Sequence, residues 1–155
     1  MLEKKHKLLK SQKGFTLIEL LAVIVILAII AAIAVPAIGN VIKHSRIDAV
    51  KADAIQVLNG AKLYVAGSSL EFGESNTITL KKAQLEPYLD DEAGKLTSYS
   101  VTVTNNNNKY TYTITGKGKY GSKGDETVTF KNASLKAISN AGKGDTRITP
   151  ADAGK

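Results

Sequence analysis

The sequence predicts an α+β protein in which one long N-terminal helix packs through its C-terminal half on a small antiparallel β-sheet of three to four strands, like a lollipop. Two observations lead to this fold class. All sixteen residues from Leu20 to Val35 are apolar, and two runs of alternating residues, 99–104 and 110–115, flank a stretch of asparagines. With 155 residues the chain has room for one such domain.

Residues 1–14 form a basic leader in front of the apolar run. They hold five lysines and one glutamate, so they supply +4 of the chain's net charge of +7. Lysines directly before a hydrophobic segment are typical of a positive-inside topology signal rather than of a nucleic-acid-binding surface. Gly14 separates this leader from Phe15, where the apolar run begins, and a processing boundary is expected there.

Residues 15–42 are predicted to form a transmembrane helix. The run is too long and uniform for a strand and long enough to span a bilayer, and Glu19 is the only ionisable residue between Phe15 and Ile42. Pro36 lacks a backbone donor and Gly39 has low helix propensity. We therefore expect the helix to kink or loosen near residues 36–40.

Residues 43–66 continue the helix with an amphipathic pattern. Apolar residues recur every three or four positions while charged residues occupy the other faces, which indicates one buried stripe. The helix from about Phe15 to about Val65 would be roughly 75 Å long at about 1.5 Å per residue. The residues expected to be buried are Ile47, Val50, Ala54, Val57, Leu58, Ala61 and Val65.

Residues 67–139 are predicted to form the globular head. Thr77–Leu80 reads as a short extended segment, Lys81–Leu89 as a short helical turn, and Tyr99–Thr104 and Tyr110–Thr115 as half-buried strands. Asn105–Asn108 is the expected hairpin turn, because asparagine tolerates left-handed backbone geometry. A loop over 116–124 and a third strand over 126–131 follow. Residues 140–155 are rich in Gly, Lys, Asp and Ala and predict a polar, solvated tail.

The string Lys13-Gly14-Phe15-Thr16-Leu17-Ile18-Glu19, followed by the apolar run, resembles the class III signal of type IV pilins and pseudopilins. The resemblance implies that a prepilin peptidase cleaves between Gly14 and Phe15 on the cytoplasmic side and methylates the new amine of Phe15. Removal of 14 residues leaves 141 of the 155. The mature chain would then be a structural subunit that polymerises into a helical filament.

The same resemblance implies partners and a location. The partners are further copies of the chain, the prepilin peptidase, a platform protein and assembly ATPases. The precursor would sit in the cytoplasmic (inner) membrane, and the mature protein in a cell-surface pilus or outside the cell.

Glu19, Pro36 and Gly39 are the residues expected to act in assembly. A carboxylate inside a membrane run costs several kcal/mol and so needs a partner or a function. The amine of Phe15, one helical turn away in the same chain or in a neighbour, would be that partner. The resemblance implies that Pro36 and Gly39 let the helix extend during packing. The simpler alternatives are an interfacial charge at Glu19 and a plain bend at Pro36.

Three other readings of the N-terminal segment remain. A pseudopilin of a type II secretion system or of a competence DNA-uptake apparatus carries the same signal. A general secretory signal peptide could end at Ala32-Ile33-Ala34, although a discarded signal has no use for Glu19. A signal-anchored surface protein explains the apolar run but not the string from Gly14 to Glu19.

The sequence predicts neither an enzyme nor a metal or cofactor site. There is no cysteine, His6 lies in the leader, His44 stands alone, and no nucleophile-elbow or phosphate-binding glycine motif is present. Asp90, Asp91 and Glu92 lack the alternating spacing of a calcium loop and read as a solvated acidic turn. His44 beside Lys43 and Arg46 reads as part of a basic, membrane-proximal collar.

The later half of the head is basic, and its basic residues would permit contact with DNA. Tyrosines lie among them at 110, 112 and 120, but alternating strand tyrosines are more typical of a sheet core. DNA is therefore a weakly supported partner. The basic residues are Lys117, Lys119, Lys123, Lys131, Lys136, Lys143 and Arg147.

Overall fold

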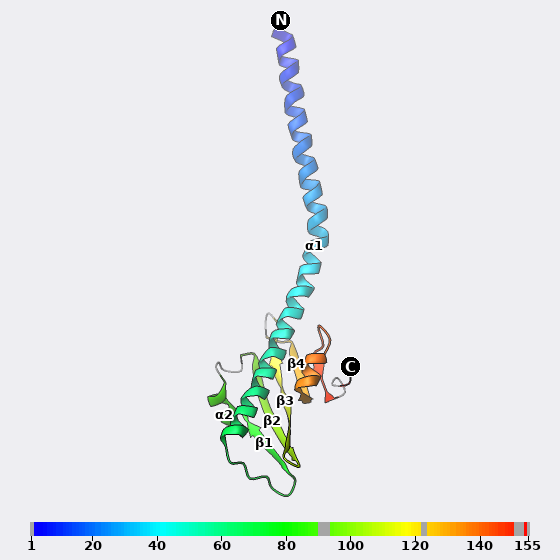
Figure 1. Ribbon diagram of the computed structural model, residues 1–155. Helices are drawn as coiled ribbons and strands as arrows, with labels where there is room; N and C mark the ends of the chain where they lie inside the picture. The colour runs from blue at the N-terminus through cyan, green and yellow to red at the C-terminus, as the bar shows by residue number, and fades with distance from the viewer. Residues whose placement is uncertain (1, 90–93, 122–123, 151–153, 155) are drawn as a thin grey trace. The chain divides into compact units, whose positions relative to one another are not determined.

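The computed structural model describes residues 2–89, 94–121, 124–150 and 154, with side chains from Thr16 onward. Its contacts divide the chain into two compact units, 1–41 and 42–155. One helix, α1 (Leu2–Gly67), runs through both (Figure 1). The predicted helix over Phe15 to Val65 is thus confirmed, and it also continues through the residues read as a leader.

The second unit contains a five-stranded sheet in the order β1-β2-β3-β4-β5, one strand more than the largest number expected. The first four strands are antiparallel neighbours, and β5 pairs with β4 in parallel. The α+β fold class is therefore confirmed. The elements after α1 are β1 (Thr77–Lys81), α2 (Lys82–Leu85), the 3-10 helix η1 (Glu86–Tyr88), β2 (Leu96–Asn106), β3 (Lys109–Lys119), β4 (Thr127–Ser134), α3 (Leu135–Asn140) and β5 (Arg147–Ile148).

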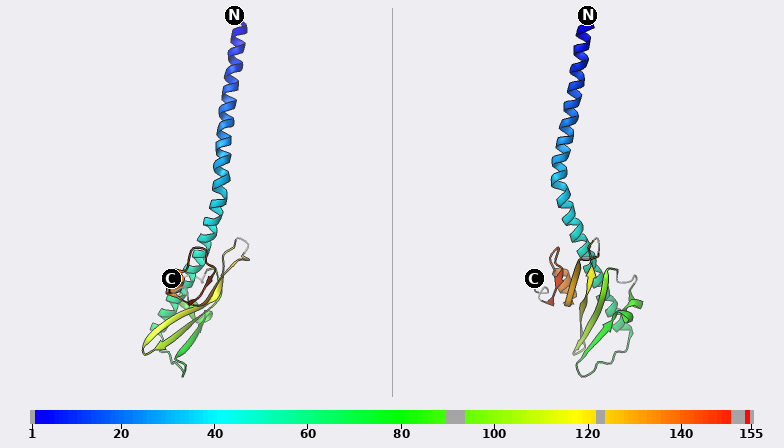
Figure 2. Two further views of the ribbon diagram at one scale, coloured as in Figure 1. Left: turned by 90° about the vertical axis from the view of Figure 1, so that its right-hand side faces the viewer. Right: turned by 180° about the vertical axis from the view of Figure 1, so that it is seen from behind.

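The C-terminal part of α1 supplies the helical side of the hydrophobic core. Figure 1 shows it in front of the sheet, and the right-hand view of Figure 2 shows it behind, so it covers one face only. Six of the seven residues predicted for its buried stripe, from Ile47 to Ala61, are fully buried, and Val65 is half-buried. Burial of a Leu, Ile or Val side chain contributes about 1.5–3 kcal/mol, so this stripe is a main source of the head's stability.

A polar contact fixes where β2 starts relative to α1. The backbone N–H of Lys95 donates to Oδ2 of Asp53 at 2.9 Å. Gly94 has a φ of +41°, a conformation that side chains disfavour, and it lies against the same carboxylate. Asp53 therefore holds the turn that leads into the sheet.

The asparagine hairpin forms where the sequence predicts it. Asn107 and Asn108 have φ values of 51° and 65°, as a two-residue hairpin turn requires. The backbone N–H of Asn108 also donates to Oδ1 of Asn105 at 2.9 Å. The strands on each side, β2 and β3, are longer than the alternating runs alone indicated.

The loop expected over 116–124 is wrong in its first half, because β3 continues to Lys119. Gly116 and Gly118 are strand residues. A Cβ on Gly118 would collide with Cγ1 of Val50 in α1, and one on Gly116 would collide with the carbonyl oxygen of Ser98. These glycines thus permit close packing of helix and strands rather than making a loop.

The polar tail expected from residue 140 is instead attached to the head over much of its length. The backbone N–H of Thr129 donates to the carbonyl of Thr146 at 2.7 Å, and Ile148 in β5 is fully buried. Lys51 of α1 is 6% exposed, and its Nζ donates to the carbonyl of Gly142 at 2.8 Å. Residues 142–148 therefore belong to the folded head.

Candidate processing and assembly site

Residues 17–42 of α1 present an apolar helical surface in which Glu19 is the one ionisable side chain. Every large hydrophobic side chain from Leu17 to Ile42 is about half exposed or more, and the segment is long and apolar enough to cross a membrane by length and composition. Each such side chain would gain about 1.5–3 kcal/mol on leaving water. Lipid or other helices must supply that burial, because this part of the chain has no core of its own.

Gly14 and Phe15, the residues of the expected cleavage point, lie within the helical backbone of α1. A glycine inside a helix is about 1 kcal/mol less favourable than alanine, so the helix is locally weak where the leader meets the apolar run. The processing role of both residues stays a prediction.

Glu19 is exposed on α1, amid apolar side chains. It lies four residues after Phe15, so both fall on one side of the helix, one turn apart. Among the residues that the structure describes, no ion pair includes Glu19. Within the described residues, therefore, no ion pair offsets the cost of this carboxylate in a membrane or a helical bundle.

Pro36 and Gly39 lie inside α1, which is helical on both sides of them. Pro36 has no N–H to donate to the carbonyl of Ala32, so one helical hydrogen bond is missing. A Cβ on Gly39 would meet no atom within 4 Å. Packing within the chain thus does not require glycine at position 39, whereas it does at position 118. The kink expected near residues 36–40 stays a prediction.

The basic collar after the apolar run is tied to the head. Lys43 Nζ forms an ion pair with Oε1 of Glu126 at 3.0 Å and lies 5.7 Å from the ring centre of Tyr120. The hydrogen bond to Glu126 and then its negative charge raise the pKa of Lys43. His44 packs against Gly144, whose φ is +88°. These contacts give both residues a structural role in the head.

Within residues 2–89, 94–121, 124–150 and 154, no group of three or more His, Asp or Glu side chains could hold a metal ion. The acidic triplet Asp90, Asp91 and Glu92 lies outside the described residues, as does Lys123.

The structure separates the basic residues of the head from its tyrosines, which lie among them in the sequence. Lys117, Lys119 and Lys131 are exposed strand residues, whereas Tyr120 is buried. Tyr110 stacks on Phe72 at 5.6 Å between ring centres. Strand alternation alone would have assigned the lysines and tyrosines of β3 to opposite faces, because the lysines are at odd positions and the tyrosines at even ones.

Residues 9–35 match the family model described as the prokaryotic N-terminal methylation motif. This motif is the class III prepilin signal of type IV pilins and pseudopilins, so the resemblance seen in the sequence is confirmed. The match includes Gly14, Phe15 and Glu19 and ends one residue before Pro36. No curated protein and no solved structure matches the chain.

Proposed function

We propose that this chain is the precursor of a structural subunit of a type IV pilus, which polymerises through α1 after removal of residues 1–14 and methylation of Phe15. The observation that carries the proposal is the methylation motif placed directly on a helix whose apolar surface has no cover in the chain. Proteins with this signal serve as filament subunits rather than as enzymes.

Assembly would exchange lipid for protein around the apolar helix. In the membrane the side chains of residues 17–42 contact lipid, and in the filament they would contact the same segment of other copies. One surface of a subunit then meets a different surface of the next, and such a contact continues into a helical fibre of no fixed length.

Glu19 would set the register of that fibre. Cleavage after Gly14 creates a cationic amine at Phe15, one turn from Glu19 in the same chain and within reach of Glu19 in a neighbouring copy. In a helical core of low dielectric, a carboxylate without a partner is costly and a paired one is tolerated. Subunits that align an amine with Glu19 would therefore be favoured over those that do not.

Pro36 and Gly39 would allow the helix to extend where the apolar segment approaches the head. The missing hydrogen bond at Pro36 and the low helix propensity of glycine make this the weakest stretch of α1 beyond residue 20. Prepilin peptidase, a platform protein and assembly ATPases are the partners that such a filament requires.

The N-terminal residue and mass of the protein in sheared surface filaments test the proposal. We expect an N-methylated Phe15 in the unmodified protein. Gly14→Val should leave the full-length precursor in the membrane, because it places a branched side chain at the cleaved bond. An N-terminus near Val35, or a mature protein absent from every filament, would contradict the proposal. Processed protein confined to short envelope-bound assemblies would instead indicate a pseudopilin.

A variant of Glu19 separates processing from assembly. Glu19→Gln keeps the side chain's size and removes its charge, so we expect normal cleavage and no incorporation when it is the only subunit made. Glu74→Gln, which changes an exposed acid of the head, is the matched control and should assemble normally. Filaments of normal yield from Glu19→Gln alone would rule out the pairing of Glu19 with the Phe15 amine.

A further inference from the structure

The sheet of the head has one strongly cationic face. None of the residues in its five strands is an Asp or a Glu. Strand register and alternation place Tyr99, Val101 and Phe130 toward α1. The alternate residues of each strand lie on the opposite face of the sheet, called here the outer face. All the basic residues of the strands fall on the outer face: Lys81, Lys109, Lys117, Lys119, Lys131 and Arg147.

The other outer-face positions are mostly hydroxyl-bearing. One row that runs across four strands is Ser98, Lys117, Thr129 and Arg147. A parallel row joins Thr79, Thr102 and Thr113. None of these residues is buried. The right-hand view of Figure 2 shows α1 behind the sheet, and the buried residues of α3 belong to the core on that side.

Four of the cations form a cluster around Thr129. Lys117 and Arg147 are its cross-strand neighbours, Lys131 is two residues further along β4, and Lys119 is two residues beyond Lys117. Neighbouring strands are about 4.8 Å apart and alternate residues about 6.8 Å apart. The other three charges therefore lie within roughly one Debye length of Lys117 at 0.1 M salt, and the four act together on one polyanion.

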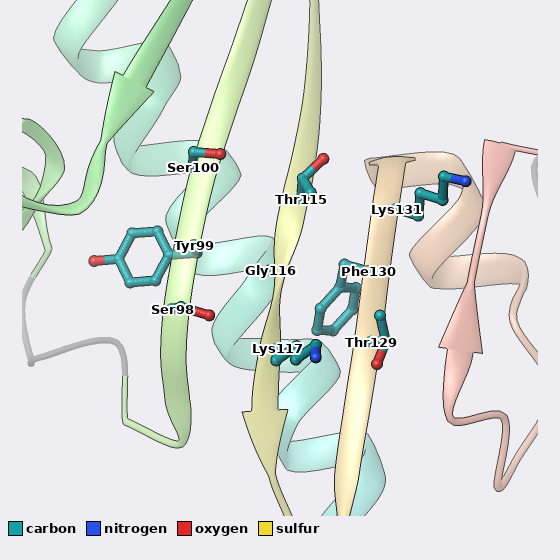
Figure 3. Close-up of a pocket in the computed structure, with 9 residues that line it drawn as sticks. All are labelled: Ser98, Tyr99, Ser100, Thr115, Gly116, Lys117, Thr129, Phe130 and Lys131. Carbon is teal, nitrogen blue, oxygen red and sulfur yellow. The ribbon is translucent and has the colours of Figure 1, made fainter.

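A shallow depression of about 450 Å³ lies in the same area. Figure 3 shows it on the side of the sheet away from α1, with Lys117 and Lys131 at its margins. Tyr99, Gly116 and Phe130, which are register partners across β2, β3 and β4, also line it. The hydroxyls around it belong to Ser98, Ser100, Thr115 and Thr129.

We propose that the outer face binds double-stranded DNA through its phosphate backbone, without sequence preference. Lys, Arg, Ser and Thr are among the side chains that contact phosphate oxygens. Single-stranded DNA is bound largely by stacking on aromatic rings, and the outer face has none, since Tyr99 and Phe130 face the core. The nearest acids by sequence precede β4 and β5. Glu126 pairs with Lys43 on α1, and Oδ2 of Asp145 accepts a hydrogen bond from the backbone N–H of Gly142.

The test uses the full-length protein in micelles of a neutral detergent and a fluorescent DNA duplex, with binding measured by anisotropy at about 50–200 mM salt. Each phosphate neutralised contributes about 0.9 to the slope of log affinity against log salt, so the four clustered cations should contribute about −3 to −4 to the slope of the full-length protein. The variant Lys117→Gln/Lys131→Gln/Arg147→Gln should weaken binding at least tenfold at about 0.1 M salt and reduce the slope by roughly one per residue changed.

The matched control removes the same charge from exposed positions outside the strands, as Lys62→Gln/Lys136→Gln/Lys143→Gln. It should bind as the unmodified protein does. Lys117→Arg/Lys131→Arg should also retain binding, and the single change Lys119→Gln gives a second loss variant if the triple one unfolds. The filament is not needed for this test, so failure here leaves the proposed function standing.

Several results would overturn the proposal. These are no DNA binding by the unmodified protein, equal losses in the outer-face and control variants, or tighter binding of a single strand of the same sequence. Displacement of the duplex by a glycerol-phosphate polymer at a lower phosphate concentration would assign the outer face to an envelope polymer instead of DNA.

Discussion

Residues 16–41 and 42–67 belong to one continuous helix, yet their apolar side chains meet opposite conditions. In the first segment the large hydrophobic side chains are exposed along its length. In the second, the apolar stripe from Ile47 to Ala61 is fully buried against the sheet of the same chain. The backbone is the same in both, so the difference comes from what the rest of the chain provides to cover them.

The comparison shows how one helix can serve folding and assembly separately. The apolar stripe of the second segment is buried within the head, so substitutions in this stripe should change the stability of the head. The first has no cover in the chain, so its substitutions should act on membrane insertion and filament formation. Matched changes in the two segments test this division.

The largest effect is expected from truncating a buried leucine. Leu58→Ala removes a fully buried side chain and should lower the head's free energy of unfolding by about 2–5 kcal/mol. Leu27→Ala, at a position 57% exposed, should change it by less than about 0.5 kcal/mol. Denaturant unfolding of the full-length protein in micelles, followed by tyrosine fluorescence, measures both. Equal losses in the two variants would refute the division.

Replacing a glycine by alanine should change stability in opposite directions in the two units, because only one of the two glycines is closely packed. Gly118→Ala forces a methyl group into Val50 of α1 and should destabilise the head by about 1–3 kcal/mol. Gly39→Ala meets no atom within 4 Å and should favour the helix by up to about 1 kcal/mol. Thermal unfolding followed by circular dichroism reports both changes. If residues 36–40 must extend in the filament, Gly39→Ala should also lower filament yield.

These glycines also show where prediction from sequence stopped. The helix and its buried stripe were predictable because a 3.6-residue period over twenty residues is a strong local signal. The Asn107-Asn108 turn was predictable because few residues tolerate its backbone. Gly116 and Gly118 were misread as a loop, since local sequence does not distinguish a flexible glycine from one required by a neighbouring helix.

Elements that depend on distant contacts were missed for a related reason. The two residues of β5 have no alternating pattern, and they form a strand only because β4 lies beside them. The cationic outer face was only partly predictable. The basic residues can be read from the sequence, but the strand register that places Arg147 beside Thr129 cannot. At the N-terminus the opposite holds, since Gly14, Phe15 and Glu19 are recognised as a linear motif.

Lys51 and Glu19 extend the comparison to charged groups on α1. Lys51 is buried and has partners, with Nζ donating to the Gly142 carbonyl and, at 3.5 Å, to Oδ1 of Asp48. Lys51→Met keeps the packing of the stem and removes these bonds, so we expect a loss of about 0.5–1.5 kcal/mol. Amide hydrogen exchange should show where in the head the stability is lost. We expect faster exchange at the Thr129 N–H, which donates to the carbonyl of Thr146. Unchanged exchange there would mean that Lys51 does not hold the loop.

The smallest effect is expected from the ion pair at the start of the second segment. Lys43 and Glu126 are each nearly half exposed, so solvent and salt screen their attraction. Because Glu126 raises the pKa of Lys43 above its ordinary 10.5, the pair stabilises the head at neutral pH and loses this contribution as the pH rises above that value. Lys43→Gln should therefore lower the unfolding midpoint slightly at pH 7 and low salt. The effect should be absent at high salt and should fade as the pH rises from 10.5 through the raised pKa of Lys43. Ile42→Ala, one residue earlier and 47% exposed, should leave the salt dependence unchanged. A salt-independent loss in Lys43→Gln would instead assign the contribution of Lys43 to its contact with the Tyr120 ring.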